Sequence, residues 1–529
     1  MSSVSAEPTR VPAVVVGAGP AGMAAAVALA ETGVPVTVLD TYNQPGGQYH
    51  RASAVGPDAG RLAAAADAPS GADTRVAADV TTGSDAPTGS REDPTVAAFR
   101  HHLGVGTVHL RSATTVWSAS AGAGGFTLRL TGAGDAGVAR TAAAGAATTA
   151  DPDPVLLHAE VVLVATGATD RVLPFPGWDL PGVFTAGGAQ ALLKGPGVKV
   201  GERAVVAGSG PFLLPVATAL AEAGTTVAAV AEAQHAGVIA REARRAAGHL
   251  DVLTEGLSYA RTLARHRVPV RHATAVTAAA GDGRVEEVTL QRLDERWSPV
   301  PGTDERVAVD AACVSFGFVP QVGLPALLGC ALTSDPVWGD PVVVVDTHQH
   351  TSVDGVFAAG ESTGVGGAAL AAEEGALAGL AAAHALGAID LGALRDRGAP
   401  HRRARARKQA FAATLGRMYR RGEGWVHWLD DDTIVCRCEE VDHAAVRHAV
   451  CELGAVDQRS VKLTTRCGMG RCQARMCGDA VAALVAHHSG EPADDLAALS
   501  TPTVLAPVRL RDVATLAATM STPGTTTDR

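Results

Sequence analysis

The 529-residue sequence predicts an α/β protein with two dinucleotide-binding units followed by a small module that carries cysteines. The stretches VVVGAGPAG at 14–22 and VVAGSGPFLLP at 205–215 each place a glycine turn between a strand-like valine run and a helix-like apolar run. Five of the last six cysteines fall in two short stretches, at 433–441 and 464–477. A chain of this length exceeds one hydrophobic core, so several domains are expected.

Bulk composition excludes some classes of protein. The net charge of −10 argues against a nucleic-acid binder, because phosphate neutralisation needs a basic surface. No apolar run is long and uninterrupted enough to predict a transmembrane segment. A cytoplasmic location is therefore expected, where thiols stay reduced and structural disulfides are a poor explanation for eight cysteines.

The first unit has every part of a dinucleotide-binding turn. Gly17 allows the tight turn, Gly19 lets the backbone approach a pyrophosphate, and Gly22 permits close packing of helix on strand. The following helix presents unpaired N–H groups to the phosphates. An acidic residue ends the second strand, where it can accept a hydrogen bond from a ribose hydroxyl. The expected contacts of this unit are Gly17, Gly19, Pro20, Ala21, Gly22 and Asp40.

The second unit matches the same pattern less completely. Gly208, Gly210 and the acidic Glu232 are present, but Leu213 stands where the third glycine is expected. Two interpretations remain open: a site for NAD(P) or another adenine nucleotide, and a nucleotide-binding fold that is retained but empty.

Two further stretches indicate that the first nucleotide is FAD. VATGATDR at 164–171 and TSVDGVFAAGE at 351–361 resemble the later fingerprints of the glutathione-reductase-like flavoproteins, which have two dinucleotide-binding domains. The resemblance implies that Thr166 and Gly167 line the cofactor and that Gly360 and Glu361 approach its phosphate and ribityl chain. Glu361 departs from the aspartate that is usual at its position.

The chain lacks the redox cysteine pair that disulfide reductases of this superfamily carry beside the flavin. Its first cysteine is Cys313, and neither nucleotide-binding unit contains a plausible pair. Thiol–disulfide chemistry is therefore not the expected reaction, and Cys313 and Cys330 are predicted to be core residues.

The late cysteines fit a metal centre. Four thiolates can hold a [2Fe-2S] cluster or a structural zinc ion. Cys436 and Cys438 share one loop, and the second pair comes from Cys467, Cys472 and Cys477, which leaves two candidates at the same C-x4-C spacing. A cluster is favoured over zinc and over free core thiols, because zinc is redox-silent beside a flavin.

A more specific resemblance covers most of the chain. CRCEEV followed by TTRCGMGRCQARMC is similar to the [2Fe-2S] module of the bacterioferritin-associated-ferredoxin type, as it occurs in the alpha subunits of heteromeric amine and amino-acid dehydrogenases. This family includes the corresponding subunits of opine oxidase and hydrogen cyanide synthase, and the alpha subunits of proline and D-hydroxyproline dehydrogenases. The similarity extends to QPGGQYHR at 44–51, which adds Gly47 and Gln48 to the expected cofactor contacts.

The resemblance also implies a ligand set. In that family the position of Cys467 is often alanine, so the implied ligands are Cys436, Cys438, Cys472 and Cys477, with Cys467 as a spare. Gln473-Ala474-Arg475 departs at its middle residue from the usual glycine. Cys451, on an expected helix, is predicted to be buried and inert.

The implied function is that of an electron-transfer protein with FAD and a [2Fe-2S] cluster, acting as one subunit of a dehydrogenase or oxidase for the C–N bond of an amine, amino acid or opine. The implied partner is a flavoprotein beta subunit of the D-amino-acid-oxidase fold, and a small ferredoxin-like protein is a further candidate. No acid–base constellation is recognised, so no catalytic residue is named. The alternatives are a stand-alone NAD(P)H-dependent reductase and a non-catalytic iron–sulfur binding or scaffold protein.

The expected domain organisation follows from these motifs. The FAD-binding domain is discontinuous, at 10–175 and 326–395, with low-complexity insertions near 51–94 and 131–154. The second dinucleotide-binding domain spans 176–325, a basic linker helix with a solvated face spans 396–430, the cluster domain spans 431–490, and a tail spans 491–529.

Overall fold

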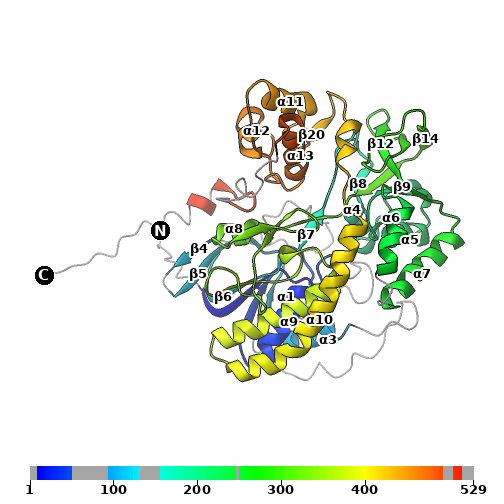
Figure 1. Cartoon of the computed structure of the whole chain (residues 1–529). Coiled ribbons are helices and arrows are strands. Elements are labelled where there is room, and N and C mark those ends of the chain that lie inside the picture. Colours follow the sequence, from blue (N-terminus) through cyan, green and yellow to red (C-terminus); the bar gives the residue numbers. More distant parts are fainter. Residues whose placement is uncertain are drawn as a thin grey trace, which may run out of the picture.

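The computed structural model describes residues 9–50, 93–122, 124–131, 155–245, 250–491, 504–510 and 512–514. The two predicted low-complexity insertions and most of the predicted tail lie outside these residues. The described chain forms two nucleotide-binding units and a C-terminal module that lies above them in Figure 1. Within these ranges, no helix has the length and apolar character needed to cross a membrane.

The first unit is built on a seven-stranded sheet of mixed direction. Its strand order is β3-β2-β1-β6-β5-β4, with β19 also paired to β6. The strands β3, β2, β1, β6 and β19 are parallel, and the predicted meander β4–β5 adds antiparallel strands at one edge. The bounds are β1 Thr9–Val16, β2 Val36–Leu39, β3 Val108–Arg111, β4 Thr115–Gly122, β5 Gly125–Thr131, β6 Val155–Val164 and β19 Val356–Ala358.

Small residues bring the helices of this unit close together. The helix α1 (Pro20–Ala30) packs on α9 (Ala368–Ala385), and α3 (Pro94–Gly104) packs beside α1. A Cβ atom added at Gly375 would lie 2.0 Å from the Ala21 carbonyl oxygen, and one at Gly379 would lie 2.5 Å from that of Ala25. The two glycines therefore allow α9 to contact the backbone of the helix that begins at the glycine turn.

The second unit repeats the parallel arrangement in a five-stranded sheet of order β11-β10-β9-β15-β8, with a three-stranded antiparallel sheet β12-β13-β14 beside it. Its strands are β8 Val183–Thr185, β9 Arg203–Gly208, β10 Thr226–Glu232, β11 Val270–His272, β12 Thr274–Ala280, β13 Glu287–Arg292, β14 Glu305–Ala308 and β15 Ala311–Ser315. Its helices are α4 Ala186–Lys194, α5 Leu213–Glu222, α6 Ala236–Arg245 and α7 Leu250–Arg265.

Short elements lie outside the main sheets, and those after β16 pack on the first unit. The short elements are β7 Ala168–Asp170 paired with β16 Phe318–Pro320, α8 Gly323–Leu327, β17 Leu332–Ser334 paired with β18 Pro341–Val343, and the 3-10 helix η1 Gly360–Thr363. The chain crosses between the units at β7 and returns at β16, so these two strands form the seam between them.

The C-terminal module shares a hydrophobic core with the second unit. Aromatic rings join the two parts: the Phe316 ring lies 6.1 Å from that of Trp297 and 5.7 Å from that of Trp428. The module contains η2 Glu423–Trp428, β20 Ile434–Cys436, β21 Val441–Asp442, α11 His443–Cys451, α12 Gln458–Thr465 and α13 Gly478–Ser489. Because one core spans both parts, the module is docked on the second unit rather than tethered to it.

Two predictions about isolated cysteines have different outcomes. Cys313 and Cys330 are buried, as predicted for core residues. The prediction that Cys451 is buried is wrong, because this thiol is exposed at the end of α11. The buried positions of α11 are His443, Val446, Ala449 and Val450, and helical periodicity turns residue 451 away from that stripe.

A basic helix forms over residues 391–418 rather than over the whole of the predicted 396–430, and its charged face is not simply solvated. It is α10 (Leu391–Met418), which in Figure 1 runs along α9 toward the second unit. Arg405 pairs with Glu374 of α9 at 3.3 Å, and Lys408 pairs with Glu373 at 2.7 Å. The basic side chains were predicted to face water, and this prediction missed their partners. Sequence periodicity gives no information about acidic residues on a neighbouring helix.

Candidate functional site

The glycine turn of the first unit has backbone positions that only glycine can occupy. Gly17 has φ +106°, and a Cβ atom there would lie 2.2 Å from the Ala165 carbonyl oxygen. A Cβ atom at Gly22 would lie 1.8 Å from the Gly17 carbonyl oxygen. The turn and the start of α1 are therefore held together by direct backbone contact, as a dinucleotide-binding turn requires.

The N-terminus of α1 is open to a phosphate. Gly19 is its N-cap and provides no side-chain cap, and Pro20 begins the helix. A Cβ atom at Gly19 would meet only the Gly47 Cα, at 3.9 Å, so the space in front of the first turn is free. Gly47, at φ +59°, approaches the turn from the 44–51 loop. Unpaired N–H groups and this free space together fit a pyrophosphate.

Asp40 lies where an acidic ribose ligand is expected. Only 6% of it is exposed, and its carboxylate accepts hydrogen bonds from the backbone N–H of Ala18 (2.6 Å) and of Tyr42 (2.7 Å). These bonds fix the carboxylate beside the glycine turn. A carboxylate at this place, at the end of the second strand, is the group that accepts a ribose hydroxyl in dinucleotide-binding units.

Of the other predicted cofactor contacts, some lie against α1 and others contact different parts of the chain. A Cβ atom at Gly360 would lie 2.9 Å from the Ala21 Cβ, so this glycine lies against α1. Thr166 donates its hydroxyl to the Gln321 carbonyl at 2.6 Å, and Gly167 follows it at φ +71°. The Gln48 side chain is exposed and donates to the Tyr42 hydroxyl at 3.1 Å.

Glu361 has its carboxylate turned toward its own loop. It accepts from the backbone N–H of Gly367 at 2.8 Å and of Gly366 at 3.4 Å, and burial raises its pKa. Sequence reasoning missed its neighbour Glu374, which accepts from the Gly360 N–H at 3.0 Å and orients that glycine against α1. A glutamate in an alanine-rich helix gave no sign of this role.

The second unit repeats the acidic hydrogen-bonding pattern of the first. Glu232 accepts from the N–H of Gly210 at 2.9 Å and of Gln234 at 2.8 Å, at the same sequence separations as Asp40 shows with its partners. Burial raises the pKa of Glu232 to about 7. The repeat predicted from sequence therefore extends to individual hydrogen bonds.

The segment after α10 lies over the acidic end of β10 in this second unit. Gln234 donates its side-chain amide to the Arg420 carbonyl at 3.3 Å. Burial raises the pKa of Tyr419, and the nearby Glu232 carboxylate raises it further. The position where a ribose would bind is thus lined by the protein's own linker.

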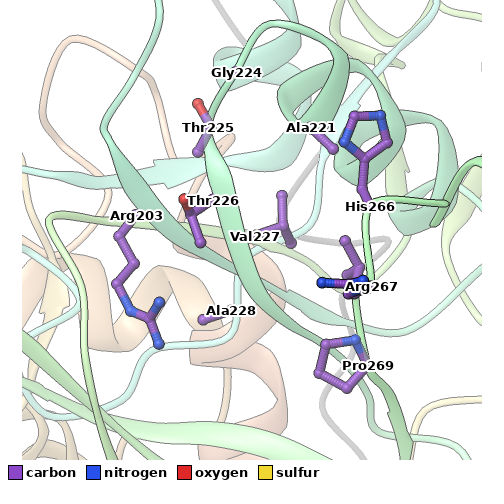
Figure 2. A pocket seen from close by; sticks show the side chains of 11 residues that line it. Arg203, Ala221, Gly224, Thr225, Thr226, Val227, Ala228, His266, Arg267 and Pro269 are labelled. Atoms are coloured by element: carbon purple, nitrogen blue, oxygen red, sulfur yellow. The ribbon is translucent and has the colours of Figure 1, made fainter. Parts of the chain in front are cut away.

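A hollow of ≈ 390 Å³ lies in the second unit, away from its glycine turn (Figure 2). Arg203 and Thr226, which line it, begin β9 and β10, whereas Gly208 ends β9. Nucleotides bind at the carboxyl ends of parallel strands. This hollow is therefore at the wrong edge of the sheet for a nucleotide.

Three of the five thiols of the C-terminal module form one group. The sulfur atoms of Cys436, Cys467 and Cys477 all lie within 4.8 Å of one another. Cys438 and Cys472 lie outside this group; burial, and to a lesser extent the neighbouring Cys438 side chain, raise the pKa of Cys472. The structure therefore groups two predicted ligands, Cys436 and Cys477, with the predicted spare Cys467, and the other two predicted ligands, Cys438 and Cys472, are not part of this group.

The electrostatics of the thiols fit a cationic centre. Hydrogen bonds from the thiols of Cys467 and Cys477 hold the pKa of Cys436 well below its usual range. The same contacts with Cys436 raise the pKa of Cys477 and of Cys467. One thiolate therefore forms easily, whereas several in one place require a metal to neutralise them.

Glycines bring the two cysteine loops into contact. The Gly468 N–H donates to the Cys436 sulfur at 3.5 Å. A Cβ atom at Gly470 would lie 2.1 Å from the Cys438 Cβ, so any side chain there would push the loops apart. Hydrogen bonds to sulfur and close loop contact are both features of iron–sulfur sites.

Comparison with known proteins agrees with both sites. The family model "Pyridine nucleotide-disulphide oxidoreductase" matches residues 11–385, and "BFD-like [2Fe-2S] binding domain" matches residues 434–487. Hydrogen cyanide synthase subunit HcnB of Pseudomonas aeruginosa is 32% identical over 88% of this chain and 90% of its own. An opine oxidase subunit of Agrobacterium tumefaciens is 31% identical over 95% of this chain and 91% of its own.

A solved structure extends the likeness in fold. L-proline dehydrogenase from P. horikoshii superposes with a TM-score of 0.60 at 17% identity, covering 96% of this chain and 80% of that one. The two family matches indicate FAD and a [2Fe-2S] cluster, which the glycine turn and the thiol pocket fit. The chain therefore belongs to the pyridine nucleotide-disulphide oxidoreductase family, as an FAD-dependent oxidoreductase with a C-terminal [2Fe-2S] domain.

Proposed function

We propose that this chain is the electron-transfer subunit of a heteromeric dehydrogenase or oxidase that acts on the C–N bond of an amine, amino acid or opine. The observation that carries the proposal is the presence, in one docked assembly, of an open flavin-type nucleotide site and a buried group of three thiols in the cysteine module. The relatives named as subunits of hydrogen cyanide synthase and opine oxidase support the same class of reaction.

The proposed reaction is a two-electron oxidation of the substrate. The substrate loses two electrons and two protons to form an imine, which water hydrolyses. A bound flavin can take up an electron pair, and a [2Fe-2S] cluster passes single electrons. The residues of this chain hold these groups: the α1 N-terminus and Asp40 bind the nucleotide, and the thiols bind the cluster.

We assign the cluster to Cys436, Cys438, Cys472 and Cys477. A [2Fe-2S] centre needs two thiolates for each iron. Cys436 lies with Cys477, and Cys438 lies with Cys472, so each loop contributes one thiol to each pair. Cys467 is a third thiol beside the first pair and is the competitor in this assignment.

The substrate pocket is assigned to a partner flavoprotein of the D-amino-acid-oxidase fold, and a small ferredoxin-like protein is a further candidate for the assembly. The relatives are named as subunits, which supports a hetero-oligomer. Expression of a tagged chain from its native operon tests the assignment. A co-purifying flavoprotein and amine-dependent dye reduction are expected, whereas a solitary preparation that oxidises an amine by itself would refute the assignment.

The electrons are proposed to come from that partner rather than from NAD(P)H. The Tyr419–Arg420 segment over Glu232 supports this choice, because a nucleotide in the second unit would have to displace it. The test is an anaerobic titration of the purified holoprotein with NADH and with NADPH, followed by flavin absorbance. No bleaching is expected, while dithionite, as a control, bleaches the flavin fully; bleaching by either nucleotide would favour the stand-alone reductase.

A further inference from the structure

A buried group of charges lies at the seam between the nucleotide-binding units and the C-terminal module. Arg171, which directly follows β7, is only 5% exposed. Its guanidinium contacts the Asp340 carboxylate at 2.5 Å through one nitrogen and the Asp479 carboxylate at 2.7 Å through another. Arg421 also pairs with Asp479. One arginine therefore bridges two carboxylates that are far apart in sequence.

The four residues belong to different parts of the molecule. Arg171 follows β7, Asp340 directly precedes β18, Arg421 lies in the linker after α10, and Asp479 lies in the first turn of α13. Figure 1 shows the module above β7, where these parts meet. Asp479 is two residues beyond Cys477, so this contact fixes the position of a proposed ligand loop.

Further contacts join the module to the second unit and have a different character. Trp178 donates its indole N–H to the Ile434 carbonyl at 2.5 Å, and the Arg437 guanidinium lies 5.1 Å from the centre of the Trp178 ring. Together with the shared aromatic core, they hold the module against the second unit. Apolar and stacking contacts tolerate small sliding movements, whereas a planar guanidinium bound to two carboxylates fixes direction.

We propose that Arg171 is a positioning residue that sets the orientation of the iron–sulfur module relative to the flavin-binding unit. The inference rests on the proposed electron-transfer function, because electrons pass efficiently only between centres held at a fixed, short separation. Loss of Arg171 would leave the buried Asp340 carboxylate without its ion-pair partner and Asp479 with Arg421 alone, which destabilises the local arrangement. Arg171 is not part of the glycine turn and is not one of the cysteine ligands. A variant at Arg171 can therefore still bind FAD and the [2Fe-2S] cluster.

The test compares four variants. Arg171→Met and Arg421→Met each remove one cation from the network, and Arg171→Lys keeps a charge without the planar fork. Arg397→Met is the matched control, because Arg397 forms an exposed pair with Glu31 at 3.3 Å, away from the seam. Hydrogen–deuterium exchange is measured on cofactor-free protein over residues 419–433 and the first turn of α13.

We expect exchange in these segments to rise by at least about tenfold in Arg171→Met, and by less in Arg171→Lys. In the loaded protein, the absorbance of flavin and cluster is retained, while cluster reduction by photoreduced flavin slows by a similar factor. Arg421→Met, at a partly exposed position, is expected to show the same changes. If Arg171→Met does not fold, Arg421→Met alone tests whether the network orients the module. Wild-type exchange in both methionine variants would overturn the proposal. A wild-type flavin that never reduces the cluster would instead overturn the proposed function.

Discussion

The glycine turn makes a strong prediction for the substitution Gly22→Ala. The new Cβ atom would lie 1.8 Å from the Gly17 carbonyl oxygen, where real Cβ contacts stay above 3.0 Å. The start of α1 must therefore move by about 1.2 Å away from the turn. Hydrogen bonds to charged groups contribute about 1.5–3 kcal/mol each, so loss of one or two phosphate contacts from α1 costs about 3 kcal/mol. This corresponds to about 100-fold weaker FAD binding.

The assay is a titration of cofactor-free protein with FAD, followed by quenching of flavin fluorescence. Gly104→Ala is the matched control, because a Cβ atom at the end of α3 would meet nothing within 4 Å, and unchanged affinity is expected. Gly19→Val tests the same site without backbone conflict: its side chain would enter the open space before α1 and block the phosphate. Wild-type affinity in both Gly22→Ala and Gly19→Val would refute the proposed FAD site.

Two further predictions concern the thiols and the second unit. Cys467→Ser should keep the visible spectrum and iron content of the cluster, whereas Cys477→Ser should lose both; the opposite result would exchange these two ligands in the assignment. Glu232 has a pKa of about 7, above its ordinary 4.5, so the native state holds a proton that the unfolded state releases between these values. The stability of the wild type relative to Glu232→Gln, from urea unfolding, should therefore fall as pH rises from 4.5 to 7 and level off above. A difference that stays constant over this range would contradict the raised pKa.

The local patterns of the chain determined its elements and most of the first site. The valine run, the glycines and Asp40 predicted β1, α1 and β2, and in the structure β2 ends at Leu39, immediately before that carboxylate. The thiol spacing predicted a metal centre, and all five thiols lie in one region. These predictions succeed because strand, turn, helix and ligand loop are each specified by residues close together in sequence.

Spacing could not decide how distant parts meet. Trp178 and Ile434 are 256 positions apart, and Arg171 and Asp340 are 169 apart, yet each pair is hydrogen-bonded. Only the packing of the module on the second unit brings the first pair together, and only the crossing of the chain at β7 brings the second. Position on an expected helix also did not decide which face of α11 is buried, and Cys451 lies on the exposed face.

The sequence by itself thus determined two nucleotide-binding units, their glycine turns and a thiol module, since each depends on short-range geometry. The tertiary structure decided that the linker contacts the acidic end of β10 through Arg420 and that Arg171 joins the module to the seam. Both are polar contacts between segments that are far apart in the sequence. The partners in such contacts are set by three-dimensional packing. A buried charge such as that of Arg171 is stable only beside an opposite charge, and the fold decides which residue provides it.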